Sequence, residues 1–471
     1  MKNFIKNGII PIGAYCSPMP PKGDYPNKIT EEQYKAVKDA GIDIIYAHSE
    51  VMNSPTEEYA FLSLDLAEKT GLTVFVRDEI AKEYVALGDK DDKPFKLLTE
   101  QEKCDLDERF KKSLLRYCNH KAFGGISFWD EPGYDSFEGI KRAKDVFDSV
   151  CPGKNFYVNM YPYYISPAQY QFGYWCNKEK AKATNPHFDV VEGGKNIDRY
   201  EFLYDSYIEQ VGPDIFSYDA YPFCTFGSAN TAIHEVLWEL PQFLHAREEE
   251  NGTPFAVFLQ AGGMWEGSTH VRIPTYAEIS LGVGVPLLYG AKVLQVFPYS
   301  YPNDWLNDDV AQAGLIDRYG EKTRIYYDYQ KVFSFVRAMQ GELVKSKLKG
   351  IIKSGKYENG LPCDEELKKI AWSECIFNGE LSKKCSCEIT SCKGVEKIES
   401  DVQCLTGVLD VDGKDGFFVV NNSATSCANY TIQFNNQVSC LIIQDGERKE
   451  VVTDKVTLSL SEGAFALITC R

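Results

Sequence analysis

The sequence has little of what membrane, nucleic-acid and metal proteins need. No apolar run among its 471 residues approaches the roughly 20 residues that span a bilayer. It has no long run of lysine or arginine, and its formal net charge is -17. Nucleic acids and anionic membranes both attract basic surfaces. We therefore expect neither a nucleic-acid nor a membrane partner.

Histidine is also scarce. There are six, none in an H-x-H pair, and only His48 ends a predicted strand. This disfavours a metal-dependent hydrolase, because such sites usually draw several His ligands from strand ends. The sequence implies no metal and no cofactor.

The 15 cysteines are scattered without the paired spacing of a metal site. The N-terminal stretch "MKNFIKNGIIPIGAY" is interrupted by Pro11 and Gly13, unlike the apolar segment of a signal peptide. Reduced thiols and a cytoplasmic location are the expectation. The oligomeric state stays open, with a homo-oligomer among the alternatives.

What is present is a regular alternation of short apolar runs and amphipathic segments up to about residue 345. The eight runs lie at 8–15, 43–50, 72–79, 123–131, 155–162, 214–222, 254–263 and 292–300. Continuous apolar runs are typical of parallel strands buried on both faces. Eight strand–helix units predict an α/β (β/α)8 TIM barrel over residues 1–345. An open doubly wound sheet is the alternative, but no G-x-G-x-x-G follows the first strand.

Two of the amphipathic segments carry helix boundary signals. Residues 30–41 and 56–71 each open with Thr followed by Glu and end at Gly. These residues predict an N-cap at each start and a C-cap at each end.

After residue 345 the helical periodicity disappears. Short β-rich runs at 416–423, 429–436, 439–446 and 455–470 are separated by turn signals such as "DVDGKDG". We predict a small all-β domain over 346–471, an antiparallel β-sandwich. Packing against the barrel is its expected role, and carbohydrate binding is the alternative.

The C-terminal ends of barrel strands form the active-site face, and here they are rich in carboxylates, amides and rings. The candidates are Glu50, Asp78, Trp129, Asp130, Glu131, Asn159, Tyr161, Asp219, Tyr221, Gln260, Trp265, Glu266 and Tyr299. Rings stack on the apolar faces of sugars, while carboxylates and amides bind hydroxyl groups. A carbohydrate substrate is therefore expected, although Glu50 and Asp78 also fit ion-paired structural roles.

The motifs "FWDEP" at 128–132 and "SYDAYP" at 217–222 resemble the (β/α)8 glycoside hydrolases of the large retaining superfamily that includes families 5 and 42. The resemblance also covers the small C-terminal β-domain. It implies that Glu131 is the general acid/base and that Tyr221 contacts the reacting region. Two departures matter: the residue before the acid is Asp130 rather than Asn, and Gln260 stands where the strand-seven nucleophile is expected.

An Asp-Glu pair ending strand four is also similar to hexosaminidases in which the substrate's own 2-acetamido group is the nucleophile. That likeness implies Glu131 as acid, Asp130 as the residue orienting the acetamido group and Tyr221 as an assistant. Inversion, with Asp219 or Glu266 activating water, is a third mechanism. The sequence does not separate the three.

Other interpretations of the same residues remain. The acidic stretch could belong to a helix start, with Asp135 or Ser136 as the cap. Pro132 favours an extended conformation for Glu131, closing the strand.

The stretch 164–198, with Trp175 and Glu192, is expected to cover the cleft. We predict a glycoside hydrolase of an oligosaccharide or glycoconjugate, and a catalytically inactive carbohydrate-binding barrel is the alternative.

Overall fold

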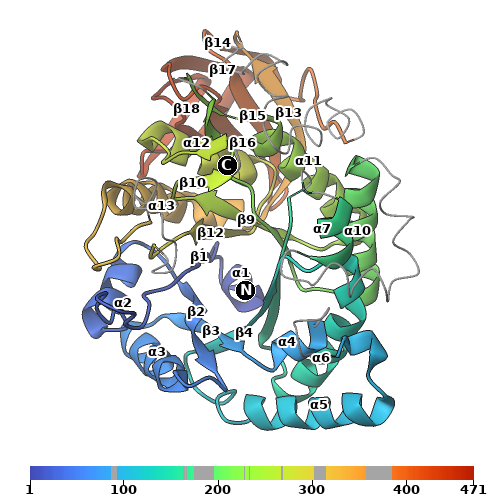
Figure 1. Ribbon diagram of the computed structural model, residues 1–471. Helices are drawn as coiled ribbons and strands as arrows, with labels where there is room; N and C mark the ends of the chain where they lie inside the picture. The colour runs from blue at the N-terminus through green and yellow to red at the C-terminus, as the bar shows by residue number, and fades with distance from the viewer. Residues whose placement is uncertain are drawn as a thin grey trace.

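The computed structural model describes residues 1–85, 93–162, 165, 167–173, 196–226, 229–232, 234–266, 269–301, 314–356 and 385–471. Its first part is a closed barrel of eight strands in the order β1-β12-β9-β6-β5-β4-β3-β2, and every pair in it is parallel. Figure 1 looks along this ring, with the helices around it. Each of the eight predicted runs coincides with one barrel strand, although β2 continues past its run to Met52, so the TIM barrel is confirmed and the open sheet is excluded.

The strands and the surrounding helices have the following bounds. The barrel strands are β1 (Ile12–Ala14), β2 (Ile44–Met52), β3 (Thr73–Asp78), β4 (Phe123–Asp130), β5 (Asn155–Met160), β6 (Phe216–Tyr218), β9 (Phe255–Gln260) and β12 (Val293–Phe297). The helices are α2 (Glu31–Asp39), α3 (Glu57–Thr70), α4 (Ala81–Val85), α5 (Glu100–Leu114), α6 (Phe137–Val150), α7 (Pro167–Phe172), α10 (Asn196–Val211), α11 (His234–Asn251), α12 (Tyr276–Leu288) and α13 (Arg324–Leu343). None of the described helices is both long and apolar enough to cross a membrane.

Side chains along each strand alternate between the barrel interior and the layer under the helices, as the pleat requires. In β3, Phe75 packs in the interior beside Tyr46 and Tyr157, with ring centroids 5.1 Å from Tyr46. Its neighbours Val74 and Val76 belong to the larger core that the helices cover. The alternation thus fixes which strand residues can reach the mouth of the barrel.

Bulky rings and one short helix fill the barrel interior at the N-terminal end of the strands. Gly13 has no side chain because a Cβ there would lie 2.3 Å from the Tyr46 ring. Helix α1 (Lys2–Lys6) lies at the centre of the ring in Figure 1. The amino group of Met1 donates to Asn155 Oδ1 at 2.7 Å, and Phe4 packs on the interior cluster. A substrate can therefore bind only at the opposite end, where the strands have their C-termini.

The helix signals are partly confirmed. Thr30 caps α2 by accepting from Gln33 N, and Gly71 ends α3 in the left-handed conformation. The prediction for Thr56 was wrong in one respect, because it precedes α3 without a side-chain cap bond. Likewise Ser136 precedes α6 without such a bond.

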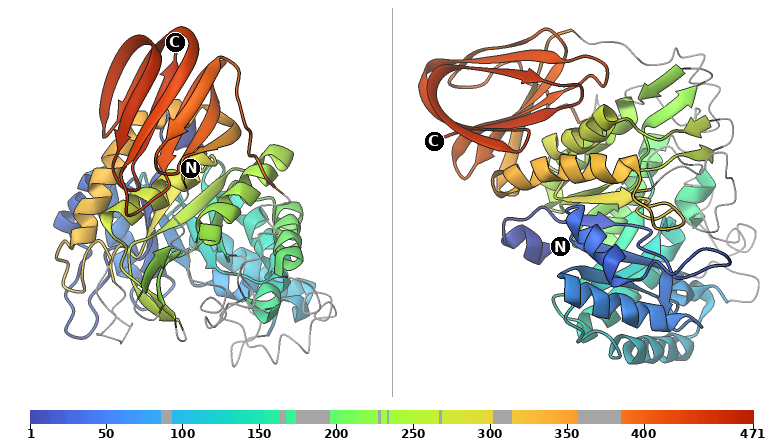
Figure 2. Two further views of the ribbon diagram at one scale, coloured as in Figure 1. Left: turned by 90° about the horizontal axis from the view of Figure 1, so that it is seen from above. Right: turned by 90° about the vertical axis from the view of Figure 1, so that its left-hand side faces the viewer.

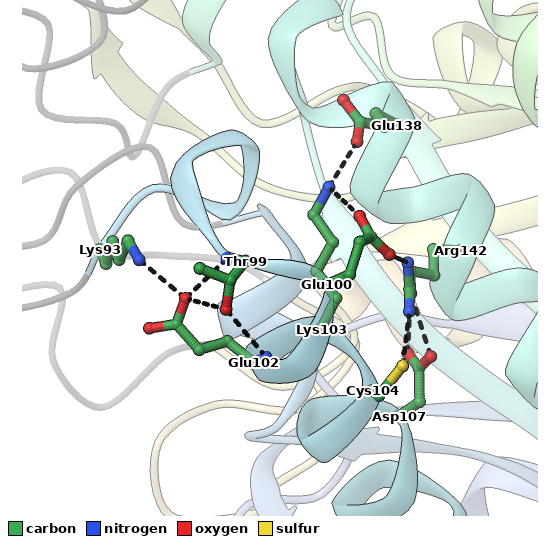
Figure 3. A network of polar contacts seen from close by, with 9 residues as sticks. All are labelled: Lys93, Thr99, Glu100, Glu102, Lys103, Cys104, Asp107, Glu138 and Arg142. Carbon is green, nitrogen blue, oxygen red and sulfur yellow. Dashed lines mark hydrogen bonds and ion pairs between the residues drawn. The ribbon is translucent and has the colours of Figure 1, made fainter.

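Helices α5 and α6 are tied together by the polar network of Figure 3. Thr99 and Glu102 form a reciprocal capping box at the start of α5. Arg142 of α6 pairs with Asp107 at 3.0 Å and with Glu100 at 3.1 Å. The network lies on the outside of the barrel and therefore positions helices rather than reacting groups.

A second, four-stranded antiparallel sheet with the order β10-β11-β7-β8 was not predicted. It consists of β7 (Phe223–Phe226) and β8 (Ala229–Ala232), which follow β6, and β10 (Met264–Glu266) and β11 (Thr269–Val271), which follow β9. In the right-hand view of Figure 2 it projects from the barrel on the side away from the C-terminal strands.

The C-terminal part is antiparallel, as predicted. Its strands are β13 (Ser346–Ser354), β14 (Val395–Ser400), β15 (Cys404–Val411), β16 (Lys414–Asn421), β17 (Ala428–Gln444), β18 (Glu447–Leu460) and β19 (Phe465–Cys470). They form one hydrogen-bonded sheet in the order β13-β15-β16-β19-β17-β14, with β18 on β17. The sheet bends over itself into a sandwich around its own apolar core (Figure 2).

Two strand boundaries in this domain were predicted wrongly. The runs 429–436 and 439–446 are one strand, β17, which continues through a register shift between Gln433 and Val438 instead of turning. The run 455–470 is divided between β18 and β19 by a turn in which Gly463 has a φ of 64°.

The sandwich packs on α12 and α13. A Cβ at Gly284 of α12 would lie 3.0 Å from the Phe465 ring, so a glycine allows the close approach. Arg448 of β18 donates to Ala338 O at 2.6 Å and pairs with Glu342. The predicted division at 345/346 falls between α13 and β13 and stays a prediction.

Candidate active site

The polar residues at the mouth of the barrel divide into an interior group and an outer group. Asp130, Asn159 and Asp219 are linked by hydrogen bonds across the ends of β4, β5 and β6. These three strands are neighbours in the barrel although they are distant in the chain. The interior group is the candidate active site.

Glu131 has an unusual backbone. Its φ is 51°, in the left-handed region, and its N–H donates to Asn159 O at 2.9 Å. The expectation of an extended Glu131 was therefore wrong. Pro132 does disfavour the right-handed helical region at this position, but the chain turns into the left-handed one. Such a conformation costs on the order of 1–3 kcal/mol and is concentrated at functional sites.

The carboxyl groups of Glu131 and Asp219 hydrogen-bond to each other. Two carboxyl groups can do so only when a proton lies between them. Burial, and then the charge of Asp130, raises the pKa of Asp219 to about 7. The Glu131 contact lowers the pKa of Asp219, so Glu131 is the donor of this hydrogen bond and Asp219 is the group that ionises near neutral pH. A general acid must be such a proton donor.

Asp130 is in a different environment. Asn159 Nδ2 donates to Asp130 Oδ1 at 3.1 Å, and the Tyr15 hydroxyl also hydrogen-bonds to this carboxylate. Burial raises the pKa of Asp130, whereas Asn159, the charge of Arg77 and the Tyr15 bond oppose the rise. These groups stabilise the anionic form of Asp130 relative to its neutral form.

A chain of donors fixes the orientation of Asn159. Gln295 Nε2 and the Tyr157 hydroxyl each lie 2.8 Å from Ser217 Oγ. Ser217 then donates its own proton to Asn159 Oδ1 at 3.0 Å. The amide NH2 of Asn159 must therefore point to the carboxylates, and it hydrogen-bonds to both Asp130 and Asp219.

The sequence-based candidates did not include Tyr15 or Tyr157. Tyr15 directly follows β1, and Tyr157 lies in the interior of β5. Tyr15 could have been found by applying the strand-end rule to the first strand as well. Tyr157 carries no such signal, because a tyrosine in a buried strand is usually a packing residue.

Tyr221 and Trp129 lie at the edges of this group. The Tyr221 hydroxyl is 3.5 Å from Asp219 Oδ2, a long contact, and its ring lies 5.5 Å from that of Phe297. Trp129 is partly buried and packs on the core beneath the helices.

Gln260 occupies the strand-seven end, but its amide is fully used by backbone groups. Its Oε1 accepts from Phe223 N at 2.9 Å, and its Nε2 donates to Phe223 O at 2.9 Å and to Arg272 O at 2.6 Å. A carboxylate could not donate to those two carbonyl groups. Gln260 thus anchors the second sheet to the barrel, which accounts for an amide at this position.

Four candidates lie outside the interior group. Asp78 points to α5, where it accepts from Ser113 at 2.5 Å and from Tyr117 at 2.8 Å. Glu50 is buried against Ser17, and burial raises its pKa. Tyr161 and Tyr299 are buried in the core under the helices.

The side chains of several predicted residues lie outside the described part of the structure. Trp265 and Glu266 lie in β10, and their side chains are outside the described residues, as are Trp175 and Glu192. Asp135, the other proposed cap, accepts from Lys96 at 2.9 Å and Gln171 at 2.7 Å. Within the described ranges no three His, Cys, Asp or Glu residues form a group that could hold a metal ion.

Comparison with known proteins defines the class of fold. No protein-family model and no curated protein matches the sequence. A GH42 β-galactosidase from G. stearothermophilus is similar in structure at a TM-score of 0.53 and 10% identity, with 98% of each chain covered. A family 39 glycoside hydrolase from Bacteroides cellulosilyticus has a TM-score of 0.50 at 11% identity, covering 98% of this chain and 81% of that one.

A β-galactosidase from the psychrophilic Marinomonas ef1 has a TM-score of 0.47 at 11% identity. The match covers 79% of this chain and 65% of that one. The GH42 β-galactosidase with a TM-score of 0.53 confirms the expected likeness to family 42 for the fold, a (β/α)8 barrel followed by an all-β domain. A fold hosts many activities, so the chemistry must be argued from the site.

Proposed function

We propose that the chain is a glycoside hydrolase that cleaves an O-glycosidic bond of an oligosaccharide or glycoconjugate. The observation that carries the proposal is the meeting of the Glu131, Asp130 and Asp219 carboxyl groups at the ends of β4 and β6. Burial raises the pKa of both aspartates, the charge of Asp130 raises that of Asp219 further, and Asn159, Arg77 and Tyr15 oppose the rise at Asp130. Glycoside cleavage needs an acid for the leaving oxygen and an anion facing the positive charge that develops on the sugar. Carboxyl groups whose environments differ in this way are typical of such sites.

In this proposal Glu131 protonates the leaving group and Asp130 stabilises the developing charge. Asp219 keeps the proton on Glu131, and Asn159 orients both aspartates. No role of a nucleophile is assigned to Gln260, because its amide is engaged with Phe223 and Arg272.

The identity of the nucleophile is the finer part of the proposal. With an N-acetylhexosaminide, Asp130 would orient the acetamido group, and the substrate itself would supply the nucleophile. With other sugars, Asp130 or an activated water would do so. Proton NMR of the first-formed product separates retention from inversion, and faster hydrolysis of an N-acetylglucosaminide than of the matching glucoside supports substrate assistance.

The direct test is the Glu131→Gln variant with two aryl glycosides of one sugar. We expect its kcat to fall about 10²- to 10⁴-fold for a phenyl glycoside, the usual contribution of a general acid. A dinitrophenyl glycoside needs no proton on its leaving group and should be affected much less. Glu138→Gln, at an exposed position on α6, is the matched control.

Equal activity of the wild type and Glu131→Gln towards both glycosides would defeat the assignment of Glu131. Absence of hydrolysis of any aryl glycoside, together with sugar binding, would favour the inactive carbohydrate-binding barrel. A carbohydrate is the proposed partner. The cytoplasmic location, the homo-oligomer and the exclusion of nucleic-acid and membrane partners stay predictions of the sequence.

A further inference from the structure

Arg77 lies at the mouth of the barrel and points to its interior. Two residues before it, Phe75 packs in the interior cluster, and side chains two apart on a strand share a face. Asp78, the next residue, points the other way and binds Ser113 and Tyr117 of the helix layer. Arg77 is therefore on the same side of the barrel wall as Asp130.

The guanidinium of Arg77 acts on this site only at a distance. Its charge opposes the rise in the pKa of Asp130 and in that of Tyr15. Across the part of the chain that the structure describes, however, the Arg77 side chain forms no hydrogen bond and no ion pair within 4.0 Å. It is partly exposed, so a ligand in the barrel mouth can reach it.

An arginine has five N–H donors in a planar fork, a geometry that matches a carboxylate or a sulfate. Neutral sugar hydroxyls are more commonly bound by amides and carboxylates, which this site also contains. A positive charge whose donors are unused, next to the carboxyl groups that would act on the sugar, indicates an acidic sugar.

We propose that Arg77 binds an anionic substituent, a carboxylate or a sulfate, on the sugar next to Asp130 and Glu131, so that the substrates are acidic glycosides. This inference rests on the proposed glycoside hydrolase function. It makes Arg77 a specificity-determining residue, whereas the acid and the stabilising anion remain Glu131 and Asp130.

The test compares aryl glycosides in matched pairs on the full chain. Uronides are paired with their parent hexosides, and 6-sulfated sugars with the unsulfated ones, in both anomers. We expect one acidic member to exceed its neutral parent in kcat/KM by at least tenfold. The pair in which this happens distinguishes a carboxylate from a sulfate.

Two variants then separate binding from the effect of charge on Asp130. Arg77→Met should lower kcat/KM for the acidic substrate about 10- to 100-fold more than for its neutral parent, the range expected for a charged hydrogen-bonded contact. Arg77→Lys keeps the charge but not the planar fork of donors. Relative to Arg77→Met, it should therefore restore kcat/KM more completely for the neutral substrate than for the acidic one. Arg109→Met, at an exposed arginine on α5 paired with Glu83, is the control.

Equal losses for both substrates in Arg77→Met, or a preference of the wild type for neutral glycosides, would overturn the inference while leaving the glycosidase proposal intact. Absence of hydrolysis of every pair would overturn both.

An independent observation concerns two cysteines in the C-terminal domain. Cys440 of β17 and Cys470 of β19 are directly opposite each other in the antiparallel register. Arg471 N donates to Ser439 O at 2.8 Å in the adjacent pair. Hydrogen-bonded and non-hydrogen-bonded pairs alternate, so Cys440 and Cys470 form a non-hydrogen-bonded pair, with Cα atoms expected about 4.5 Å apart.

That separation lies within the range of disulfides, about 4.4–6.8 Å. The two thiols already hydrogen-bond to each other, which lowers the pKa of Cys440 and raises that of Cys470. Cys440 is buried and Cys470 is partly exposed. One thiol is thus accessible to an oxidant, and the other is in position to resolve the product.

We infer that Cys440 and Cys470 are a site of reversible disulfide formation with a small disulfide such as oxidised glutathione. The Cys470 thiol loses its proton and attacks oxidised glutathione, whose disulfide bond breaks. A mixed disulfide forms at Cys470, and the first glutathione leaves as the reduced thiol. The Cys440 thiolate then displaces the second glutathione. One Sγ–Sγ bond forms, and one oxidised glutathione becomes two reduced ones, taking up the two electrons and two protons of the thiols.

The test is oxidised-glutathione treatment of the full chain, followed by alkylation and peptide mapping. We expect a cross-linked Cys440–Cys470 peptide, absent in Cys470→Ser and still present in Cys427→Ser, where an exposed thiol is removed. The midpoint of thermal unfolding should rise by several degrees on oxidation of the wild type, because the cross-link restricts the unfolded chain. Equal alkylation of Cys440 before and after oxidation would overturn the inference.

Discussion

Glu131, directly after β4, and Asp219, directly after β6, hydrogen-bond through their carboxyl groups at the mouth of the barrel. Asn159 of the intervening strand β5 hydrogen-bonds to Asp219 and to Asp130. Three consecutive barrel strands therefore contribute to one polar group.

The pH dependence of activity should follow the ionisation of Asp219. Because burial and Asp130 raise the pKa of Asp219 to about 7, we expect kcat/KM of the wild type to change near pH 7, where Asp219 becomes an anion that accepts from Glu131. In Asp219→Asn the anion that favours a protonated Glu131 is gone, so the alkaline limb should move to lower pH. The measurement is kcat/KM from pH 5 to 9.

An Asp145→Asn variant, at an exposed position on α6, serves as the control for this profile. An alkaline limb that stays in place in Asp219→Asn would show that Asp219 does not govern the proton.

The same group makes folding stability depend on pH. The pKa of Asp219 is about 7 in the folded chain against an ordinary value of 3.8, so the folded state binds more protons between these values. The contribution of Asp219 to the free energy of unfolding is therefore present at low pH and is lost as the pH rises through 7. Asp219→Asn should therefore gain stability relative to the wild type between pH 5 and pH 8, by at most about 3 kcal/mol, since only the interval from pH 5 to about pH 7 lies in the range where the folded state binds the extra proton. Urea unfolding at the two pH values measures the difference, and a constant difference would contradict it.

Introducing a carboxylate at position 260, the end of the seventh barrel strand, should not create a nucleophile. In Gln260→Glu, the carbonyl groups of Phe223 and Arg272 lose their donor and face a carboxylate instead. We expect a loss of about 2–3 kcal/mol in stability, the typical cost of unsatisfied buried groups, and no gain in kcat. Denaturant unfolding and steady-state kinetics test this prediction, with the exposed Gln101→Glu as control; increased activity would refute it.

The second sheet depends on a buried ion pair. Arg272 pairs with Glu278 at the start of α12, and its Nε donates to Cys224 O at 3.2 Å. Arg272→Met leaves the Glu278 carboxylate buried without its cation, so we expect a loss of about 3–5 kcal/mol. Arg109→Met removes an exposed pair and should cost at most about 1 kcal/mol. Thermal unfolding compares the two variants, and equal shifts would contradict the argument.

The barrel was predictable because its signal is local. Eight apolar runs separated by amphipathic segments can be read directly along the chain, and each one coincides with a strand. The strand-end rule then selected Asp130, Asn159 and Asp219, because consecutive parallel strands place their C-terminal ends at one face.

The same rule could not decide which way each side chain points. Asp78 and Tyr161 also stand at strand ends, but they pack into the helix layer. The direction depends on register, and β-bulges at β3/β4 and β4/β5 shift it. A shift of one residue moves a side chain to the other face of the wall.

The sequence by itself determined the class of fold, the strand that carries Glu131 and the absence of a carboxylate at position 260. Only the tertiary structure decided that Glu131 hydrogen-bonds to Asp219, that Gln260 is bonded to the second sheet, and that Arg77 faces the interior without a bonded partner among the described residues. The physical reason is that hydrophobic periodicity is a property of neighbouring residues. Hydrogen bonding and pKa depend instead on contacts between strands that are distant in the chain.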